Sequence, residues 1–305
     1  MEVFNELKKS PNLSLALGFF DGIHEGHQVV IKNAINIAKK EGTKSAILMF
    51  KEHPMKFITH SQVKNILNIE DKLAYLQKIG IDEVFLMDFP SLENLSAKDY
   101  IREVLVKYFS PVAITTGFNH SFGKNKSGSP KLLRELQEEF GYKYFEIPPI
   151  TCSQSVISSS AVKRAIEDGN VFFAHSLLGY KFFIRSKVVE GAHIASTLGF
   201  PSANIEYPEN IVEIPYGVYY VIVEYKGEKY NGILNHSKSP SLFPTEKPKT
   251  EVHIIDFDKD IYGEEIKVSF VTKIRNELSF ESKEKLSAQL LRDKAFVEIY
   301  KYYVN

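Results

Sequence analysis

The chain has 305 residues, and its 38 Lys plus Arg balance its 38 Asp plus Glu, so the formal net charge is zero. This balance disfavours a nucleic-acid partner that would need a basic surface, but it allows a local anion site. A 44% hydrophobic fraction and a mean hydropathy of −0.17 are typical of globular proteins, and the length suggests two domains. One cysteine excludes an internal disulfide.

The N-terminal segment lacks the apolar core of a signal peptide, and no window approaches about 18 consecutive apolar residues. We therefore expect a cytoplasmic protein with neither a membrane nor a nucleic-acid partner.

In the first half, short apolar runs alternate with amphipathic segments, which predicts a parallel sheet flanked by helices. The expected strands are 13–20, 45–50, 83–87, 112–116 and 144–147, and the expected helices are 27–40, 69–79, 96–108 and 131–140. Ser96 is a suitable N-cap for the helix that follows it. Ligands of such sheets bind at the carboxyl ends of the strands, so we expect a site in the turns that follow them.

The second half begins with two expected helices, 158–168 and 171–178, and then becomes rich in β-forming residues after Gly179. The expected strands are 182–189, 218–225, 230–234, 252–257 and 266–274, and residues 282–303 form a closing helix. Short strands joined by Gly- and Lys-containing turns favour an antiparallel barrel. We therefore expect an α/β protein with one domain over 1–180 and a second over 181–305.

The most informative local segment is Gly18 to His27, Gly-Phe-Phe-Asp-Gly-Ile-His-Glu-Gly-His, between an expected strand and an expected helix. His24 and His27 are three residues apart at the helix start and can face the same side. Gly22 and Gly26 let backbone approach a ligand closely, and a helix start favours phosphate. Two imidazoles there can stabilise charge on a reacting phosphorus centre. Ordinary loop histidines, or two zinc ligands without an obvious third, are the alternatives.

Two further segments follow the one just described: Gly-Phe-Asn-His-Ser-Phe-Gly-Lys at 117–124 and Ile-Ser-Ser-Ser-Ala-Val-Lys at 157–163. In this order, the three segments resemble the bacterial bifunctional riboflavin kinase/FAD synthetase family, within the nucleotidyltransferase superfamily. The resemblance extends over nearly the whole chain. It implies a Rossmann-like nucleotidyltransferase domain over 1–180 and a riboflavin kinase-like β-barrel domain with a C-terminal helix over 181–305.

The reaction that the resemblance implies is attack by the 5′-phosphate of FMN on the α-phosphorus of ATP, with Mg²⁺, to give FAD and pyrophosphate. His24 and His27 are then the catalytic residues that contact the ATP phosphates, and Asn119 serves both the flavin and the metal. The implied nucleotide-binding residues are Gly18, Phe19, Phe20, Asp21, Gly22, Gly26, Ser158, Ser159 and Lys163. Taken alone, the serines would be read as a helix N-cap.

In the second half, Leu-Gly-Phe-Pro-Ser-Ala-Asn at 198–204 resembles the family's kinase signature, and Glu-Val-His-Ile-Ile-Asp-Phe at 251–257 resembles its catalytic strand. The resemblance implies that Ser202 and Asn204 ligate magnesium beside ATP. Glu251 would accept the proton of the 5′-hydroxyl of riboflavin as that oxygen attacks the γ-phosphorus. Arg275 and Glu277 match a flavin-side loop.

The chain departs from the family pattern mainly in the second half. Ser186 and Ser237 stand where glycine is usual, His236 replaces Ile, and Ala-Ser at 195–196 replaces Gly-Arg. A lost glycine can forbid a positive φ, and a lost arginine removes a phosphate donor. Two interpretations follow: a bifunctional enzyme, or an FAD synthetase whose inactive kinase module serves flavin binding or regulation.

Smaller departures occur in the first half. Lys163 replaces an Arg and lacks its bidentate fork. In Phe-Lys-Glu-His-Pro at 50–54, Glu52 replaces a Pro, and His53 is either a ligand-side residue or a buried structural one. A nucleotidyltransferase for another phosphate acceptor is disfavoured by the kinase-like second half. A flavin sensor without turnover is the remaining alternative.

Overall fold

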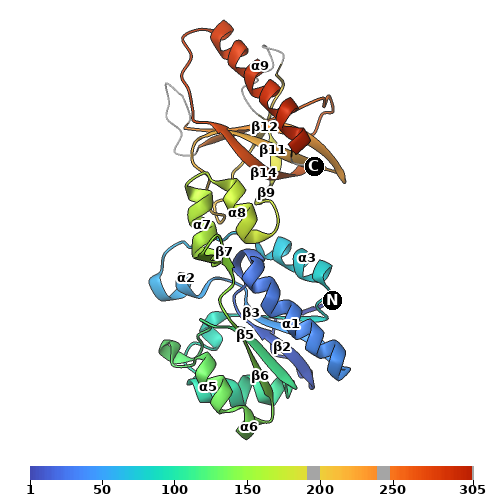
Figure 1. Ribbon diagram of the computed structural model, residues 1–305, viewed down its shortest axis with the longest axis vertical. Coiled ribbons are helices and arrows are strands. Elements are labelled where there is room, and N and C mark those ends of the chain that lie inside the picture. The colour runs from blue at the N-terminus through green and yellow to red at the C-terminus, as the bar shows by residue number, and fades with distance from the viewer. Residues whose placement is uncertain (191–199, 239–247, 304–305) are drawn as a thin grey trace. The chain divides into compact units, whose positions relative to one another are not determined.

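The computed structural model describes residues 1–190, 200–238 and 248–303, which fall into two compact units, Met1–Ser159 and Ser160–Asn305 (Figure 1). This division places helices α7 (Ser159–Glu167) and α8 (Val171–Leu178) with the barrel, apart from Ser159 itself. The expected boundary near residue 180 stays a prediction.

The first unit is built on a six-stranded parallel sheet with strand order β1-β4-β3-β2-β5-β6. The strands are β1 (Glu2–Phe4), β2 (Leu13–Leu17), β3 (Lys44–Phe50), β4 (Glu83–Met87), β5 (Ala113–Gly117) and β6 (Lys143–Ile147). All residues of β2 and β4 are buried, which is typical of central strands covered on both faces. From β2, the sheet extends through β3 and β4 on one side and through β5 and β6 on the other, so the strand order reverses between β2 and β5. Strand β2 leads into the two-histidine loop.

Helices pack on both faces of this sheet and form two separate cores. Helix α1 (Glu25–Glu41) buries Val30, Ile31, Ala34 and Ala38 against one face, together with α3 (Ile69–Ile79). These positions follow helical spacing, and Gly42 ends α1 in the left-handed conformation. The other face is covered by α4 (Ala97–Asp99) and by the π-helical segment η3 (Tyr100–Phe109).

The remaining short elements of this unit lie in its connections. They are η1 (Asp21–Ile23), α2 (Pro54–Thr59), η2 (Phe89–Ser91), η4 (Lys124–Lys126), α5 (Pro130–Glu135), α6 (Gln137–Phe140), β7 (Thr151–Cys152) and β8 (Ser155–Val156). Ser96 caps the expected third helix by accepting a hydrogen bond from the backbone of Asp99, as predicted. The expected helix 131–140 is interrupted at Leu136 and forms α5 and α6 instead.

The second unit contains a closed barrel of antiparallel strands with the order β10-β13-β12-β11-β14-β9. The strands are β9 (Phe183–Val189), β10 (Ala203–Ile205), β11 (Gly217–Tyr225), β12 (Glu228–Ser237), β13 (Lys249–Ile254) and β14 (Glu265–Arg275). Helix α9 (Lys283–Tyr300) packs Val297 against Val218, Tyr220 and Ile233 of the barrel, and η6 (Lys301–Tyr303) follows it. The predicted α/β class, parallel sheet, antiparallel barrel and C-terminal helix are confirmed.

Candidate active sites in the two units

The two-histidine loop connects the carboxyl end of β2 to α1 within the first unit. It passes through the short turn η1, and His24 is the N-cap of α1. Phe20 and Ile23 both adopt positive φ values, 53° and 39°, which non-glycine residues rarely do. Such backbone strain is concentrated at functional sites, because the surrounding structure must hold it in place.

Two glycines of this loop are closely packed. Gly22 has φ +74°, and a Cβ there would lie 2.9 Å from the side chain of Ile66. A Cβ on Gly26 would lie 3.2 Å from the ring of His24. A Cβ at either position would therefore meet Ile66 or His24. The close approach of this backbone to a ligand stays a prediction.

His24 and His27 lie together, with ring centroids 3.6 Å apart and an angle of 17° between the planes. The Nδ1 atom of His24 accepts a hydrogen bond from the backbone N–H of His27 at 3.3 Å. An accepting Nδ1 places the proton of the neutral ring on Nε2, which makes that atom a hydrogen-bond donor.

Both rings are held in the neutral form. Burial lowers the pKa of His24 to about 4, although the carboxylate of Asp21 opposes the shift. Burial also lowers the pKa of His27 well below its usual value, and the charges of His24 and Lys72 add to this effect. The loop therefore offers imidazole donors without fixed charge at neutral pH.

The loop is joined to the segment that begins α7. Ser159 Oγ donates to the backbone carbonyl of Asp21 at 3.0 Å, and the half-buried Ser158 precedes it. The Oδ1 atom of the buried Asp21 accepts a hydrogen bond from the backbone N–H of Ile66 at 2.8 Å. The structure thus brings two of the sequence-predicted residues, Asp21 and Ser159, into contact. Lys163 is half-buried on α7 in the second unit.

Asn119 is exposed in the turn after β5. Strand β5 pairs with β2 in parallel, so this turn and the two-histidine loop follow neighbouring strands at the same edge of the sheet. His120 beside it is half-buried and packs on Phe122, with ring centroids 5.6 Å apart, and desolvation of the ring lowers its pKa to about 4. Sequence reasoning had assigned no role to His120.

Phe19 is contacted by two residues from other elements. The ring of His53, which is the N-cap of α2, lies edge-on to the ring of Phe19 at 4.7 Å. The Nζ atom of Lys72 donates to the backbone carbonyl of Phe19 at 3.1 Å and lies 4.1 Å from the centroid of its ring. Sequence reasoning missed Lys72, because a single lysine in an amphipathic helix is normally solvent-exposed.

In the second unit, three polar residues form a row across neighbouring strands, and two of them, Asn204 and Glu251, were predicted from the sequence. Glu251 on β13 is directly paired with Asn204 on β10 and with Asn235 on β12. Directly paired residues of antiparallel strands place their side chains on the same face. Lys249, two residues before Glu251 on the same face, forms a 2.7 Å ion pair with its Oε1 atom. The row therefore gathers amide, carboxylate and ammonium groups on one face of the barrel.

The described part of the kinase-like signature is held against β13. The Nδ1 atom of His253 hydrogen bonds with the carbonyl of Pro201 at 2.7 Å, and its ring lies edge-on to Phe200 at 5.2 Å. This contact fixes the segment that carries the half-buried Ser202 into β10. Residues 195–196 and the beginning of the signature at 198–199 lie outside the described residues.

Arg275 has a structural partner that the sequence did not indicate. Its Nε donates to both carboxylate oxygens of Asp293 at 3.1 Å, and its Nη2 donates to Oδ2 at 2.8 Å. Asp293 is buried on α9, so this ion pair fastens α9 to the end of β14. Glu277 lies in the exposed connection that follows β14.

The substitutions at the expected glycine positions fit into regular strands. Ser186 on β9 and Ser237 on β12 do not have positive φ, and Ser186 Oγ donates to the carbonyl of Glu206 at 2.8 Å. His236 is completely buried, and its Nδ1 hydrogen bonds with Thr250 Oγ1 at 2.9 Å. These residues therefore strain no described part of the barrel.

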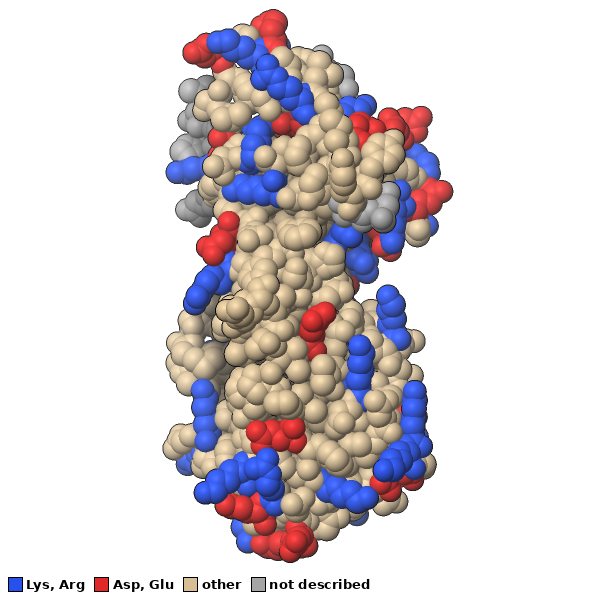
Figure 2. Space-filling model, viewed as in Figure 1, with Lys and Arg blue, Asp and Glu red and all other residues tan. Residues whose placement is uncertain are grey.

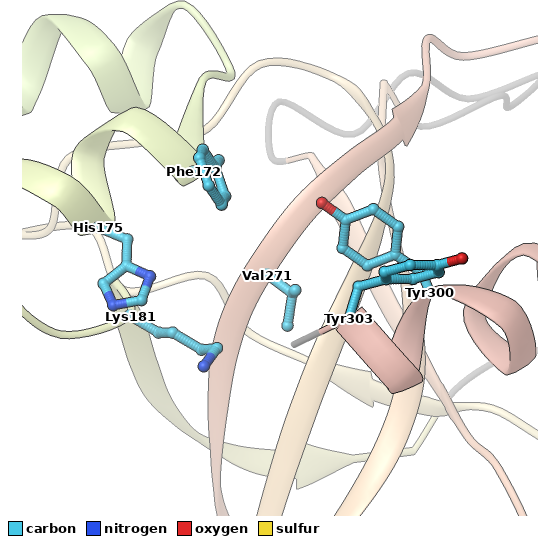
Figure 3. Close-up of a pocket in the computed structure, with 6 residues that line it drawn as sticks. All are labelled: Phe172, His175, Lys181, Val271, Tyr300 and Tyr303. Carbon is cyan, nitrogen blue, oxygen red and sulfur yellow. The ribbon is translucent and has the colours of Figure 1, made fainter. Parts of the chain in front are cut away.

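A separate cavity of about 190 Å³ lies in the second unit (Figure 3). Its lining consists of Phe172, His175, Lys181, Val271, Tyr300 and Tyr303. Phe172 and His175 come from α8, Val271 from β14, and the tyrosines from the end of α9 and from η6. No sequence-predicted site residue is among these lining residues.

A parallel α/β domain with paired histidines after its first buried strand is the arrangement of a nucleotidyltransferase, and here a six-stranded barrel follows it. The FAD synthetase family model matches residues 6–161, and the riboflavin kinase family model matches residues 178–300. The chain belongs to the family of bifunctional riboflavin kinase/FMN adenylyltransferases.

Two relatives with this name illustrate the similarity. The protein of Buchnera aphidicola (subsp. Schizaphis graminum) is 32% identical over 99% of this chain and 97% of its own length. The protein of Bacillus subtilis is 32% identical over 95% of this chain and 92% of its own length.

A solved structure is also similar over almost the whole chain. The Streptococcus pneumoniae chain, described as a macrolide-efflux protein, has a TM-score of 0.88 and 29% identity, covering 98% of this chain and 99% of its own. Among the described residues of this chain, no helix combines the length and the apolarity needed to cross a membrane.

Proposed function

We propose that the first unit transfers AMP from ATP to FMN and that the second unit phosphorylates riboflavin at its 5′-hydroxyl. The stacked neutral histidine pair at the start of α1 carries the first assignment, and the Asn204–Glu251–Asn235 row supports the second. The single cysteine favours a reducing compartment, the cytoplasm. The neutral charge balance favours small anionic substrates over a nucleic acid. Acidic and basic side chains are interspersed on the face drawn in Figure 2.

In adenylyl transfer, a phosphate oxygen of FMN attacks the α-phosphorus of ATP. The bond from the α-phosphorus to the bridging oxygen breaks, and pyrophosphate leaves with the electron pair. No enzyme-bound intermediate is required, so positioning and charge stabilisation are the tasks of the protein. The Nε2–H of His24 and the N-terminal amides of α1 are suitable donors for oxygens on which negative charge builds.

The other loop residues would surround the triphosphate. Ser158, Ser159 and Lys163 would approach it from the start of α7, and Gly18 to Gly22 would supply backbone contacts. The hydrogen bond from Ser159 to the carbonyl of Asp21 supports this assignment, since it joins the two predicted nucleotide-binding segments. Asn119, exposed at the same edge of the sheet, would contact the flavin phosphate.

Mg²⁺ would fit the oxygen donors of both sites. This ion prefers oxygen ligands and often relies on few protein groups together with substrate phosphates. The amide oxygen of Asn119 in the first unit, and Ser202 with Asn204 in the second, provide such donors, and the amide of Asn204 lies beside a carboxylate. When bound, the ion would neutralise charge on the ATP phosphates.

In the second unit, Glu251 would accept the proton of the riboflavin hydroxyl while that oxygen attacks the γ-phosphorus and ADP leaves. The ion pair with Lys249 restrains the carboxylate, and Asn204 and Asn235 are paired with Glu251 on the neighbouring strands. Glu277 would lie on the flavin side. Arg275 would support that side indirectly, because its guanidinium is bound to Asp293.

The experiment is to incubate the purified chain with ATP, magnesium and either FMN or riboflavin, and then to separate the flavins. FAD formed from FMN is the expected result for the first unit, under oxidising or reducing conditions. FMN formed from riboflavin is the expected result for the second. If no FAD forms from FMN in the presence of ATP and magnesium, the first assignment is overturned. If no FMN forms from riboflavin, the alternative of an inactive kinase module is favoured.

A further inference from the structure

A lysine of α3 is buried directly behind the two-histidine loop. Lys72 is only 2% exposed and is among the largest fully buried side chains in the described residues. Lysine is almost never buried to this extent unless its charge is compensated or used. No step of the proposed reactions has so far involved it.

The ammonium of Lys72 is directed at Phe19 of the loop. Its Nζ donates to the backbone carbonyl of Phe19 at 3.1 Å and lies 4.1 Å from the centroid of the Phe19 ring. A carbonyl acceptor and an aromatic face both stabilise a cation. The charge is therefore fixed under the backbone that connects β2 to α1.

The segment around the start of α3 supports the loop at further points. The backbone N–H of Ile66 donates to Asp21 Oδ1 at 2.8 Å, and the side chain of Ile66 fills the space beside Gly22. Asn68 is the N-cap of α3 and accepts a hydrogen bond from the backbone of Asp71. The lysine thus projects from a well-anchored helix start, which fixes the position of its charge relative to the loop.

We propose that Lys72 is a positioning residue for adenylyl transfer, which holds the Phe19 carbonyl in place and keeps a positive charge behind the loop that receives the ATP triphosphate. The inference rests on the proposed transferase function of the first unit. A charge in a buried, low-dielectric position acts more strongly on a bound polyanion than a solvated one does. Lys72 acts through the loop and does not need to touch the nucleotide.

The histidine pair provides a readout of this charge that a purely structural lysine would not affect. The titratable or charged groups with described effects on the pair are Asp21, His24, His27 and Lys72. The positive charge of Lys72 disfavours protonation of His27. Removing it makes His27 easier to protonate, so the acid limb of the rate profile moves to higher pH.

The test compares Lys72→Met, Lys72→Gln and Lys72→Arg with the wild-type chain. Methionine removes the charge and keeps the length, glutamine keeps a donor without charge, and arginine keeps the charge. Lys78→Met is the matched control, since Lys78 is exposed at the other end of the same helix. Adenylyl transfer is measured for kcat, for KM for ATP and against pH. Circular dichroism and thermal unfolding report on folding, and the riboflavin kinase rate is an internal control from the second unit.

We expect the Met and Gln variants to raise KM for ATP at least tenfold and to shift the acid limb upward. The Arg and Lys78→Met variants should resemble the wild type. An unchanged KM and pH profile in folded Met or Gln variants overturns the inference, and so does unfolding of both, because the role would then be structural. A wild-type chain that makes no FAD would instead overturn the proposed function.

Discussion

The imidazoles of His24 and His27 stack almost in parallel at 3.6 Å, and the His24 ring also caps the helix that carries His27. Two cations cannot share so small a space in a buried site without a large electrostatic cost. The pair therefore stays neutral in the folded chain, and its contribution to stability depends on pH.

Stability should fall as the pH drops from about 6.5 to about 4. The pKa of His24 in the folded chain is about 4, below the ordinary 6.5, so the unfolded chain binds more protons in this window. Unfolding is favoured there, and the loss attributable to His24 is on the order of 3 kcal/mol. Urea unfolding followed by circular dichroism between pH 7 and 4 measures it. His24→Asn, which can still accept the His27 N–H, should show a shallower pH dependence; an equal slope would contradict the assignment to His24.

Gly22→Ala should abolish most adenylyl transfer and lower the free energy of unfolding. The new Cβ would meet Ile66 at 2.9 Å, and φ is +74°, so the expected loss is about 1–3 kcal/mol. Gly42→Ala is the control, because Gly42 has a similar φ of +66° at the end of α1 but nothing within 4 Å of an added Cβ. That variant should lose about 1 kcal/mol and keep its activity. Equal losses of transfer in both variants would argue against a specific role for the loop geometry.

Glu251→Gln should remove riboflavin phosphorylation and leave adenylyl transfer intact. The amide cannot accept a proton, and loss of a general base lowers rates by roughly 10²- to 10⁴-fold. Glu265→Gln is a matched control on β14, where the carboxylate is exposed and lies 3.6 Å from Arg185. Both activities are measured on the same preparation. A Glu251→Gln variant with normal kinase turnover would exclude this carboxylate as the base.

Arg275→Met should destabilise the second unit by about 3–5 kcal/mol, since it leaves the buried carboxylate of Asp293 without its partner. The double variant Arg275→Met with Asp293→Leu should recover much of that loss, because it removes both charges. Thermal unfolding of the wild-type chain and of the two variants gives the comparison. The KM for riboflavin is measured on the same variants. If the double variant regains stability but has a higher KM for riboflavin than the wild-type chain, Arg275 also contacts the flavin. If both its stability and its KM match the wild-type chain, the role of Arg275 is confined to fastening α9.

Long periodic segments of the fold were predictable from the sequence. The bounds of α3, β4 and α8 agree with the expected ranges, since each has a clear apolar pattern and a glycine or polar residue at its ends. Several short elements were missed. β1 and β10 have three residues each, too few to show an alternation, and α2 has no buried residue to create a helical period.

The length of a barrel strand with polar residues at its end was also underestimated. The expected strand 230–234 continues to Ser237 in β12, although its last residues are polar. His236 is buried there because Thr250 on β13 provides a hydrogen bond and two tyrosine rings pack within about 5.3 Å. Such a partner lies far away in the sequence, so local patterns cannot indicate it.

The motifs located the candidate sites, but not the residues that support them. His24, His27 and Glu251 were singled out by spacing and resemblance, and the structure places the histidines in contact. Lys72, Ile66 and Asp293 were missed because their roles depend on contacts between distant segments. Arg275 has a protein partner, Asp293, that the sequence did not indicate, and its assignment to the flavin side stays a prediction.

The sheet of the first unit has open edges, unlike the barrel, and β1 covers one of them with only three residues. It pairs with Glu83 to Phe85 of β4, and Lys44 lies between the carboxylates of Glu2 and Glu83. Without β1, the backbone of β4, whose residues are all buried, would be available to strands of other molecules. The first few residues of the chain therefore bear on its solubility and self-association.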